Sequence, residues 1–381
     1  YECVPMRFIK HVYKIHTYTQ DGRLFEGKTP VSAFLNSSYD GSFIAGLMEL
    51  RYIQSLPVER IINYFESHGF TLKKPTAHKL MEKASSLFEN LYKCIRQTAL
   101  SDPYKAADET YYKILVPEKN SKGKGVRKGY LWVVVGINTR MIYLLYDDGS
   151  RSERVILNEL GSCKGIIQSD GYSPYRKLES DAYPHITRIP CLQHIKRKFI
   201  DCGEDDPDAK RIVEMINTLY QNEHKHKIGV DGWTVEQNLV HRKKYAPDIL
   251  GEIKDVLDDI EERGDLLPKS ELKEAITYLR NEWNAVVDIF NYGDTYLDNN
   301  IVERMNRYIS LSRKNSLFFG SHKGAERGAI LYTIALTCRM NKVNLFEYLT
   351  DVINRTAEWQ PNTPLEKYRL LLPDRWEKAN D

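Results

Sequence analysis

Two neighbouring strand patterns constrain the fold of this 381-residue chain more than any other feature. Residues 130–137 (YLWVVVGI) form an almost unbroken apolar run of mostly β-branched and aromatic residues, which is typical of a buried strand. Residues 141–146 (MIYLLY) repeat this pattern after only three intervening residues. Because so short a connection joins antiparallel strands, the sequence predicts a β-hairpin.

Segments on both sides extend the hairpin into a larger α/β unit. Seven segments alternate in the order strand, strand, strand, helix, strand, helix, strand, and a basic helix at 193–201 follows them. Their expected ranges are 107–115, 130–137, 141–146, 152–160, 165–171, the region of Tyr175, and 185–191. Mixed strands in this order, surrounded by helices, indicate a ribonuclease-H-like α/β fold with a mixed sheet.

Helical patterns flank this unit. Residues 207–292 predict an α-helical insertion, in which residues 270–290 show the clearest apolar stripe. The stripe consists of Leu272, Ile276, Leu279, Trp283, Val287 and Phe290. Before the sheet, helices are expected at 42–54, 57–69 and 76–100. A helix-turn-helix that binds DNA and a plain three-helix bundle fit them equally well. Lys73, Lys74, His78, Lys79 and Lys83 lie at or in the third helix.

The chain thus divides into five expected parts. The first is a small lead-in (1–40), which is either strand-rich, with short pieces such as 7–9 and 11–13, or poorly ordered. The others are a helical, helix-turn-helix-like DNA-binding domain (41–102), the ribonuclease-H-like domain (103–206 and 292–342), the helical insertion (207–291) and a C-terminal helical tail (343–381).

Composition restricts the class of protein. A hydrophobic content of 42% with 28% charged residues is that of a globular protein. The six cysteines include no Cys-x-x-Cys pair, which favours a reducing, cytoplasmic location over a disulfide framework. No apolar run reaches the roughly 20 residues of a membrane span, and no signal peptide is visible. Because the chain begins at Tyr1 rather than Met, we expect native residues to precede it.

Local charge, rather than the net charge of +3, points to a polyanionic partner. A loop at 118–128 contains Lys119, Lys122, Lys124, Arg127 and Lys128 together with two glycines. Such a loop suits a phosphate backbone, although an ordinary solvated loop has the same composition.

Three acidic residues occupy related places in the expected fold. Asp108 would lie on the central strand, Asp170 at the end of the strand beside it, and Glu303 on a helix packed over the sheet. That helix is indicated by Asp-Asn-Asn at 298–300 and by apolar residues at helical spacing, namely Ile301, Val302, Met305 and Ile309. Taken singly, Asp108 and Asp170 have ordinary cap or turn roles, and Glu303 an ion pair with Arg307.

Three converging carboxylates repel one another unless cations neutralise them. Two Mg²⁺ or Mn²⁺ ions, which prefer oxygen ligands, would serve this purpose. Glu109 follows Asp108 directly, so on a strand its side chain points to the opposite face and it is not expected to be a ligand.

Six stretches resemble insertion-sequence-66-type bacterial transposases of the DDE group. They are ADET (107–110), SDGYSPY (169–175), CLQH (191–194) with IKRKF (195–199), DNNIVER (298–304) and RKNSLFFGSHKGAERGAILY (313–332). They follow the family's order within about residues 40–355. The resemblance implies Asp108, Asp170 and Glu303 as the catalytic, metal-binding triad.

The resemblance also implies an activity and partners. The expected enzyme cleaves phosphodiesters at transposon ends and transfers the freed 3′-hydroxyl into target DNA. Double-stranded DNA, a homo-oligomer on that DNA and accessory proteins of the same element are the expected partners, with localisation at the bacterial nucleoid. DNA contacts are expected from the basic loop, and from His194, Arg304, Arg307, Arg313 and Lys314. A turn is expected at 318–321. Its Phe318 and Phe319 are expected in the core, with stacking on DNA bases as the alternative. A metal-dependent nuclease without strand transfer, or a non-catalytic DNA-binding descendant, are the alternatives.

Two features depart from the family pattern. The lead-in at 13–29 lacks the cysteine pairs of the family's zinc-ribbon-like segment, so no zinc is expected there. The family's Cys-x-x-His is kept as Cys191 and His194, but its usual central Trp-Ala is Leu192-Gln193. Such a pair is typical of half a zinc site, but no second pair accompanies it, which disfavours zinc. The sequence therefore favours a buried Cys191 and a His194 that approaches the scissile phosphate or caps the next helix.

Overall fold

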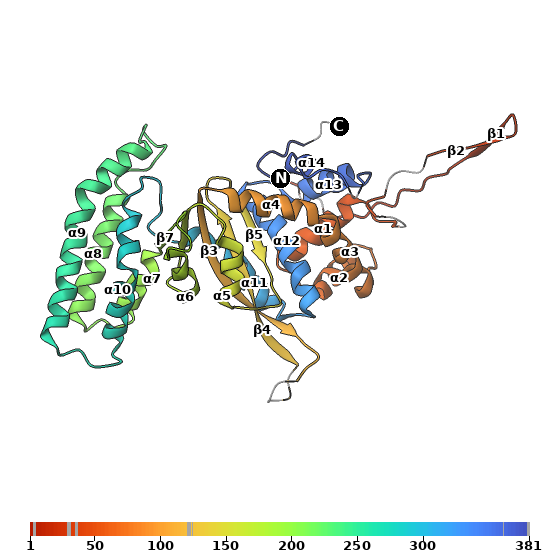
Figure 1. The fold of residues 1–381 in the computed structure, drawn as a ribbon. Coiled ribbons are helices and arrows are strands. Elements are labelled where there is room, and N and C mark those ends of the chain that lie inside the picture. Colours follow the sequence, from red (N-terminus) through yellow and green to blue (C-terminus); the bar gives the residue numbers. More distant parts are fainter. Residues whose placement is uncertain are drawn as a thin grey trace.

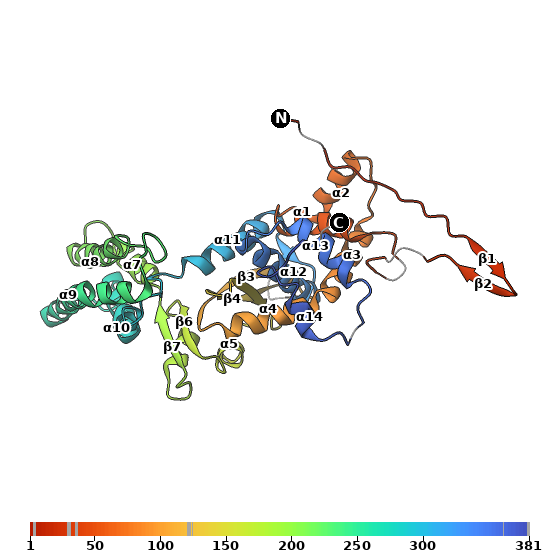
Figure 2. The same cartoon turned by 90° about the horizontal axis from the view of Figure 1, so that it is seen from above.

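The computed structural model describes residues 1–2, 5–28, 32–34, 37–119, 123, 125–360 and 362–378. Its elements lie along one long axis (Figures 1 and 2). A bundle of α8, α9 and α10 stands at one end, the main sheet lies in the middle, and α1, α2 and α3 lie at the other end. Within this described part, no helix is both long and apolar enough to cross a membrane.

The main sheet combines antiparallel and parallel strands. Its five principal strands lie in the spatial order β5 (Met141–Leu145), β4 (Val126–Gly136), β3 (Tyr104–Leu115), β6 (Gly165–Ser169) and β7 (Ile186–Pro190). The β3–β4 and β4–β5 pairs are antiparallel, whereas β6 runs parallel to both β3 and β7. The expected hairpin and the expected order of strands and helices are confirmed, and the chain has a mixed α/β architecture.

The central strand β3 is longer than expected and exchanges partners along one edge. Its other edge pairs with β4 from Lys105 to Leu115. The exchanging edge pairs with β6 at residues 104–106, and then with a two-residue strand, β8 (Phe318–Phe319), at residues 113–114. A turn was expected at Phe318, and the parallel pairing with β3 makes a strand of it instead. Asp108 lies between the two partners, in the fifth position of β3 rather than at its start.

The outer edge of β5 is covered by α12 (His322–Met340). The backbone N–H of Leu144 donates to Thr333 Oγ1 at 2.9 Å, and that of Ile142 to Thr337 Oγ1 at 3.3 Å. Both threonines are fully buried. Because an uncovered edge strand exposes hydrogen-bonding groups to other chains, these hydroxyls protect the sheet from further pairing.

Two hydrophobic clusters organise the rest of the molecule. One joins the sheet to α1 (Gly41–Tyr52), α2 (Val58–Ser67), α3 (Lys74–Leu87), α4 (Glu89–Ser101), α5 (Glu153–Leu160), α6 (Ser173–Arg176), α11 (Asn300–Asn315), α12, α13 (Leu345–Thr356) and α14 (Leu365–Arg369). The other joins the β6–β7 side of the sheet to α7 (Leu192–Ile200), α8 (Pro207–Glu223), α9 (Val235–Arg263) and α10 (Glu271–Ile289). The five-part division stays a prediction.

Two expectations about helices are wrong. The helix expected at 76–100 is two helices, α3 and α4, separated at the fully buried Phe88. No glycine or proline lies at this break. The residue between the two helices is Phe88, whose ring is fully buried. In α10, Val287 is 37% exposed, whereas Glu282, Val286 and Ile289 are buried. The buried face of α10 therefore differs from the expected apolar stripe. It includes Glu282, which occupies a core position and pairs with Arg188.

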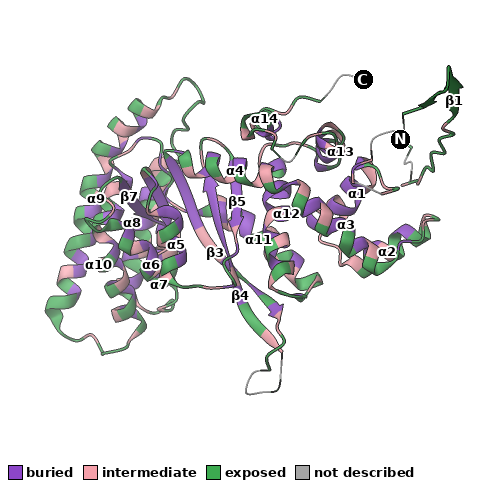
Figure 3. Cartoon of the chain, turned by 45° about the vertical axis from the view of Figure 1, so that its right-hand side comes forward, coloured by how far each residue is buried: buried purple, intermediate pink, exposed green. Residues whose placement is uncertain are grey.

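The N-terminal lead-in is strand-rich, which was one of the two forms expected, but its strands lie at other residues than expected. The pieces at 7–9 and 11–13 are not strands. An antiparallel hairpin is formed instead by β1 (Thr17–Gln20) and β2 (Arg23–Glu26), through Asp21 and Gly22 with φ of 49° and 70°. All eight strand residues are exposed, as Figure 3 shows for β1. In contrast, α12 and most of β5 and β3 are buried in the same view.

Candidate functional site

Asp108 and Asp170 lie at the same level of two neighbouring parallel strands. The last paired residues of β3 and β6 are Ala106 and Gln168, and each aspartate follows its strand's member of this pair by two residues. Asp170 comes directly after β6, which ends at Ser169. The expectation that a central strand and its neighbour carry these two acids is met by this geometry.

The surroundings of Asp108 disfavour its charged form. Burial, followed by the negative charges of Glu109 and Asp170, raises the pKa of Asp108 to about 8. Two hydrogen bonds act in the opposite direction, from the backbone N–H of Glu109 to Oδ1 at 2.8 Å and from Asn306 Nδ2 to Oδ2 at 2.7 Å. A bound cation would replace the proton that this carboxyl otherwise keeps at neutral pH.

The turn after Asp170 is fixed by the helical bundle. The backbone N–H of Gly171 donates to Tyr278 Oη of α10 at 2.9 Å. A Cβ atom at position 171 would lie 2.4 Å from the same oxygen, so this close approach requires glycine. Arg188 Nη2 donates to the backbone oxygen of Asp170 at 2.9 Å and pairs with the buried Glu282 of α10. The bundle therefore positions the Asp170 turn, which sequence patterns gave no means to detect.

Helix α11 is aligned along β3 by three polar side chains spaced seven residues apart. Asn299, directly before the helix, donates through Nδ2 to the backbone oxygen of Ala107 at 3.0 Å. Asn306 binds Asp108, and Arg313 Nη1 donates to the backbone oxygen of Tyr111 and to Thr110 Oγ1. These contacts reach β3 at residues 107–111, between the part of the strand that pairs with β6 and the part that pairs with β8. The apolar residues Val302, Met305 and Ile309 are buried as expected, while Ile301 is half-buried.

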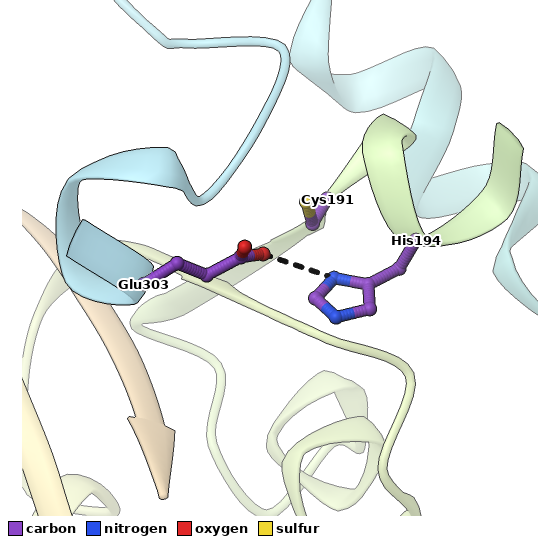
Figure 4. A group of neighbouring side chains, drawn as sticks. All are labelled: Cys191, His194 and Glu303. Carbon is purple, nitrogen blue, oxygen red and sulfur yellow. Dashed lines mark ion pairs between the residues drawn. The ribbon is translucent and has the colours of Figure 1, made fainter. Parts of the chain in front are cut away.

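Glu303 is held near Cys191 and His194 in this structure (Figure 4). Its Oε1 lies 3.6 Å from His194 Nδ1, and one ligand atom from each of the three residues lies within 4.8 Å of the others. In the described part of the chain, this is the one group of three or more such side chains close enough to share a metal ion. Asp108, Asp170 and Glu303 do not form such a group, and Glu303 forms no ion pair with Arg307 there.

The acidic neighbour of Asp108 points away from it. Glu109 accepts from Arg151 Nε at 2.9 Å and from Tyr175 Oη at 3.4 Å, whereas Asp108 contacts α11. These different partners follow the alternation of side chains along a strand.

A row of alternating aromatic rings and cations runs from Tyr172 to Arg313 and includes Arg151, the partner of Glu109. Five cation–π contacts, with distances between 3.9 and 5.2 Å to the ring centroids, join its members. In order, the row is Tyr172, Arg151, Tyr130, Lys128, Tyr111 and Arg313. Lys128 and Arg127, expected in a loop, belong to β4. Sequence patterns do not reveal this row, because its members come from five separate segments.

The remaining residues of the sequence prediction, which were expected to contact DNA or to lie in the core, have varied surroundings. Arg304, Arg307 and Lys314 are exposed on α11, and none of them forms an ion pair with a described residue. Phe319 is buried, whereas Phe318 is 48% exposed and is not a core residue. Lys122 and Lys124 lie outside the described residues.

Comparison with known proteins relates the chain to one family. The family model described as "Transposase IS66 family" matches residues 36–327. Three similar proteins of Sinorhizobium fredii carry the names uncharacterized protein y4jD, y4hP and y4qI. They are 26%, 24% and 25% identical over 87%, 100% and 96% of this chain.

The chain spans 65%, 70% and 69% of the lengths of these three relatives. The matched family region contains Asp108, Asp170, Cys191, His194 and Glu303. More than half of the chain matches the family model, and the chain therefore belongs to the IS66 family of transposases.

Proposed function

We propose that this protein is a DNA transposase that cleaves phosphodiesters at transposon ends and transfers the freed 3′-hydroxyl into target DNA. One observation carries the proposal. Asp108 and Asp170 lie at one level of adjacent parallel strands, and α11 bonds to Asp108 through Asn306, one helical turn from Glu303. The helix that carries Glu303 is thus bound to Asp108, and Asp170 follows the neighbouring strand at the same level.

The sheet supports a ribonuclease-H-like catalytic domain. Three antiparallel strands come first, the first of them is central, and a parallel fourth strand pairs with it. Helices α8, α9 and α10 lie in the sequence between Asp170 and Glu303, where an inserted domain was expected. We propose that this bundle is that insertion.

The residues at the site fit divalent cations. Burial, and then two nearby negative charges, raise the pKa of the Asp108 carboxyl. Its donor atoms, like those of Asp170, are the hard oxygens that Mg²⁺ and Mn²⁺ prefer. We propose that Asp108, Asp170 and Glu303 would hold two such ions, with Glu303 turned from His194 toward the aspartates. When bound, these ions would neutralise the carboxylates and stabilise the attacking and leaving oxygens of the phosphodiester.

The protein's own part is to position DNA beside the acids. Arg304, Arg307 and Lys314 are exposed on the helix that carries Glu303, and the cation–aromatic row adds Lys128 and Arg313. Such side chains are suited to phosphate contacts. We propose that α1, α2 and α3 form a helix-turn-helix that binds the ends. Because pairing two ends requires two active sites, we also propose an oligomer on DNA.

Metal binding and DNA chemistry together test the proposal. Calorimetry with Mn²⁺ is expected to show binding that weakens sharply in both Asp108→Asn and Asp170→Asn, but not in the control Asp181→Asn, which removes an exposed acid. With DNA that carries the element's own ends, cleavage and joining are expected in wild type and not in Glu303→Gln.

Three results would contradict this function. Cleavage without joined products would indicate a nuclease. DNA binding without cleavage in wild type would indicate a non-catalytic descendant. Mn²⁺ binding that is unaffected in both aspartate variants would show that the two acids do not share a metal centre.

A further inference from the structure

Cys191, His194 and Glu303 meet from two elements that are distant in sequence. Cys191 is the residue before α7 and His194 lies in the first turn of that helix, while Glu303 lies in the first turn of α11. Figure 4 shows the imidazole and the carboxylate facing each other with Cys191 beside them. The spacing of three residues places Cys191 and His194 on the same side of the helix start.

The distances suit a small metal ion. Bonds from zinc to nitrogen, oxygen and sulfur measure roughly 2.0–2.3 Å, so two ligands of a tetrahedral ion lie about 3.3–3.8 Å apart. His194 Nδ1 and Glu303 Oε1 are separated by 3.6 Å, and the chosen ligand atoms of all three residues lie within 4.8 Å of one another. Small side-chain rotations therefore suffice to complete the geometry.

Two of these ligand atoms have no hydrogen-bond partner. His194 Nδ1 and Glu303 Oε1 are both inaccessible to solvent, and neither accepts nor donates a hydrogen bond within the described structure. A separation of 3.6 Å is too long for a hydrogen bond between them. Because an unpaired buried polar atom is energetically unfavourable, an ion bound to both atoms would remove an energetic cost at this position.

The surrounding backbone fixes the two halves of the site without any ion. The N–H of Asn299 donates to Cys191 Sγ at 3.2 Å, and the N–H of Leu192 donates to the oxygen of Leu297 at 2.9 Å. The first bond fixes Cys191 against the residue that precedes α11, and the second ties the start of α7 to the segment before α11. Such supporting hydrogen bonds are typical of metal ligands in proteins.

We propose that Cys191, His194 and Glu303 form a zinc site with three protein ligands and an open fourth position. Thiolate, imidazole and carboxylate are the ligands of zinc, whereas Mg²⁺ and Mn²⁺ prefer oxygen ligands alone. The site differs from the one expected at Asp108 and Asp170 in its donors and shares only Glu303 with it.

Sharing Glu303 has a consequence that rests on the proposed function. Glu303 has one carboxylate, and zinc bound with Cys191 and His194 would keep it away from the two aspartates. Zinc binding and assembly of the three-carboxylate site would therefore exclude each other, so that zinc would hold the enzyme in an inactive form.

Cobalt spectroscopy on the full chain tests the zinc site directly. After chelator treatment, Co²⁺ is added as a coloured substitute for zinc, because a cobalt–thiolate bond gives a charge-transfer band that other ligands do not. We expect one equivalent to bind with this band in wild type and to be displaced by Zn²⁺. Cys191→Ser is expected to lose the band, and His194→Ala and Glu303→Gln to weaken Co²⁺ binding at least 10-fold.

Matched variants distinguish this site from other thiols and imidazoles of the chain. Cys202→Ser and His185→Ala alter a thiol and an exposed imidazole outside the cluster and are expected to leave the band unchanged. Asp108→Asn is also expected to keep it. Since Cys191 is buried, unchanged melting temperatures must accompany its variant, and the half-buried His194 gives a second variant. Wild type without a thiolate band, or a band that persists in Cys191→Ser, would overturn the proposal.

A competition experiment then tests the consequence for Glu303. Zn²⁺ is expected to weaken Mn²⁺ binding at least 10-fold in wild type but not in Cys191→Ser. If Mn²⁺ does not bind through Asp108 and Asp170 at all, the transposase proposal fails while the cobalt spectra still decide the zinc site. Equal effects of Zn²⁺ on Mn²⁺ binding in both proteins would overturn the exclusion of one metal by the other.

Discussion

Asn306 Nδ2 donates a hydrogen bond of 2.7 Å to Asp108 Oδ2 across 198 residues of sequence. This bond connects the helix that carries Glu303 to the central strand, where β3 lies between its two parallel partners. It also favours the charged form of Asp108, against burial and two neighbouring acids. Asn306 is therefore a positioning residue for the carboxylate beside it.

Removal of this amide should weaken metal binding. In Asn306→Ala, Asp108 loses a hydrogen bond that lowers its pKa, so its proton becomes harder for a cation to displace. By analogy with outer residues of metal sites, we expect Mn²⁺ affinity to fall about 10-fold or more. Calorimetry measures this, with the exposed Asn300→Ala of the same helix as the control. Equal Mn²⁺ affinities in the two variants would show that Asn306 has no such role.

Gly171 should not tolerate a methyl group. A Cβ atom there would lie 2.4 Å from Tyr278 Oη, so we expect Gly171→Ala to lower the free energy of unfolding by about 1–3 kcal/mol. Urea denaturation measures the change. The control Gly251→Ala adds a methyl group in open space on α9 and should be neutral or stabilising by up to about 1 kcal/mol.

A double variant identifies the cause of that loss. In the Tyr278→Ala background the clash is absent, so the additional loss caused by Gly171→Ala should become much smaller. An undiminished loss in this background would place the strain elsewhere in the Asp170 turn.

The ion pair of Arg242 and Glu223 should dominate the stability of the helical bundle. Arg242 is 1% exposed, donates to both carboxylate oxygens of Glu223 at 2.7 Å, and also binds Thr295. Arg242→Met leaves the half-buried carboxylate of Glu223 without its cation and removes the buried bonds to Thr295, which we expect to lower the free energy of unfolding by about 3–5 kcal/mol. Thermal or urea unfolding measures this, and a decrease of less than about 1 kcal/mol would contradict it.

The same pair should give a defined pH dependence. Burial alone raises the pKa of Glu223, but hydrogen bonds and charge from Arg242 outweigh burial and hold the pKa below its ordinary value. The unfolded chain therefore binds the proton more readily, and the stabilisation is present above an unfolded pKa of about 4.3. It is lost as the pH falls through the lower folded value.

Comparison with an isosteric variant isolates this contribution. The stability difference between wild type and Glu223→Gln should shrink as the pH is lowered from about 6 to below 4. Glu252→Gln, an exposed substitution on α9, provides the control and should show no such trend. A difference that grows on acidification would contradict the depressed pKa.

The exposed cations of α11 should contribute to DNA affinity through phosphate contacts. We expect the triple variant Arg304→Gln, Arg307→Gln and Lys314→Gln to lower affinity for all DNA sequences. The slope of log affinity against log salt should decrease in magnitude by about 0.9 for each phosphate that a cation no longer neutralises. Fluorescence anisotropy over a range of salt concentrations measures both quantities.

Cations elsewhere on the surface provide the comparison. Lys210, Lys244 and Lys254 are exposed on α8 and α9, and their replacement by Gln removes the same charge. If both triple variants change the salt slope equally, the effect reflects net charge and not contacts made by α11.

Much of this architecture could be predicted from local pattern. Unbroken apolar runs at β4 and β5 and the short turn between them require a hairpin, because so short a connection allows no other pairing. The order of strands and helices, and the places of Asp108 on β3, Asp170 after β6 and Glu303 on α11, follow from periodicity and family motifs. Boundaries were less certain, since no residue type marks the division at Phe88 or the extension of β4 through Arg127 and Lys128.

Only the tertiary structure decided which side chains meet. The pairing of β3 with β6, and the seven-residue spacing of Asn299, Asn306 and Arg313, bring α11 onto the central strand. Folding also brought Glu303, from a distant helix, beside Cys191 and His194. Sequence shows periodicity and residue type because these act over a few neighbouring residues. Contacts between distant segments depend on how whole elements pack, and here that packing turns Glu303 toward His194.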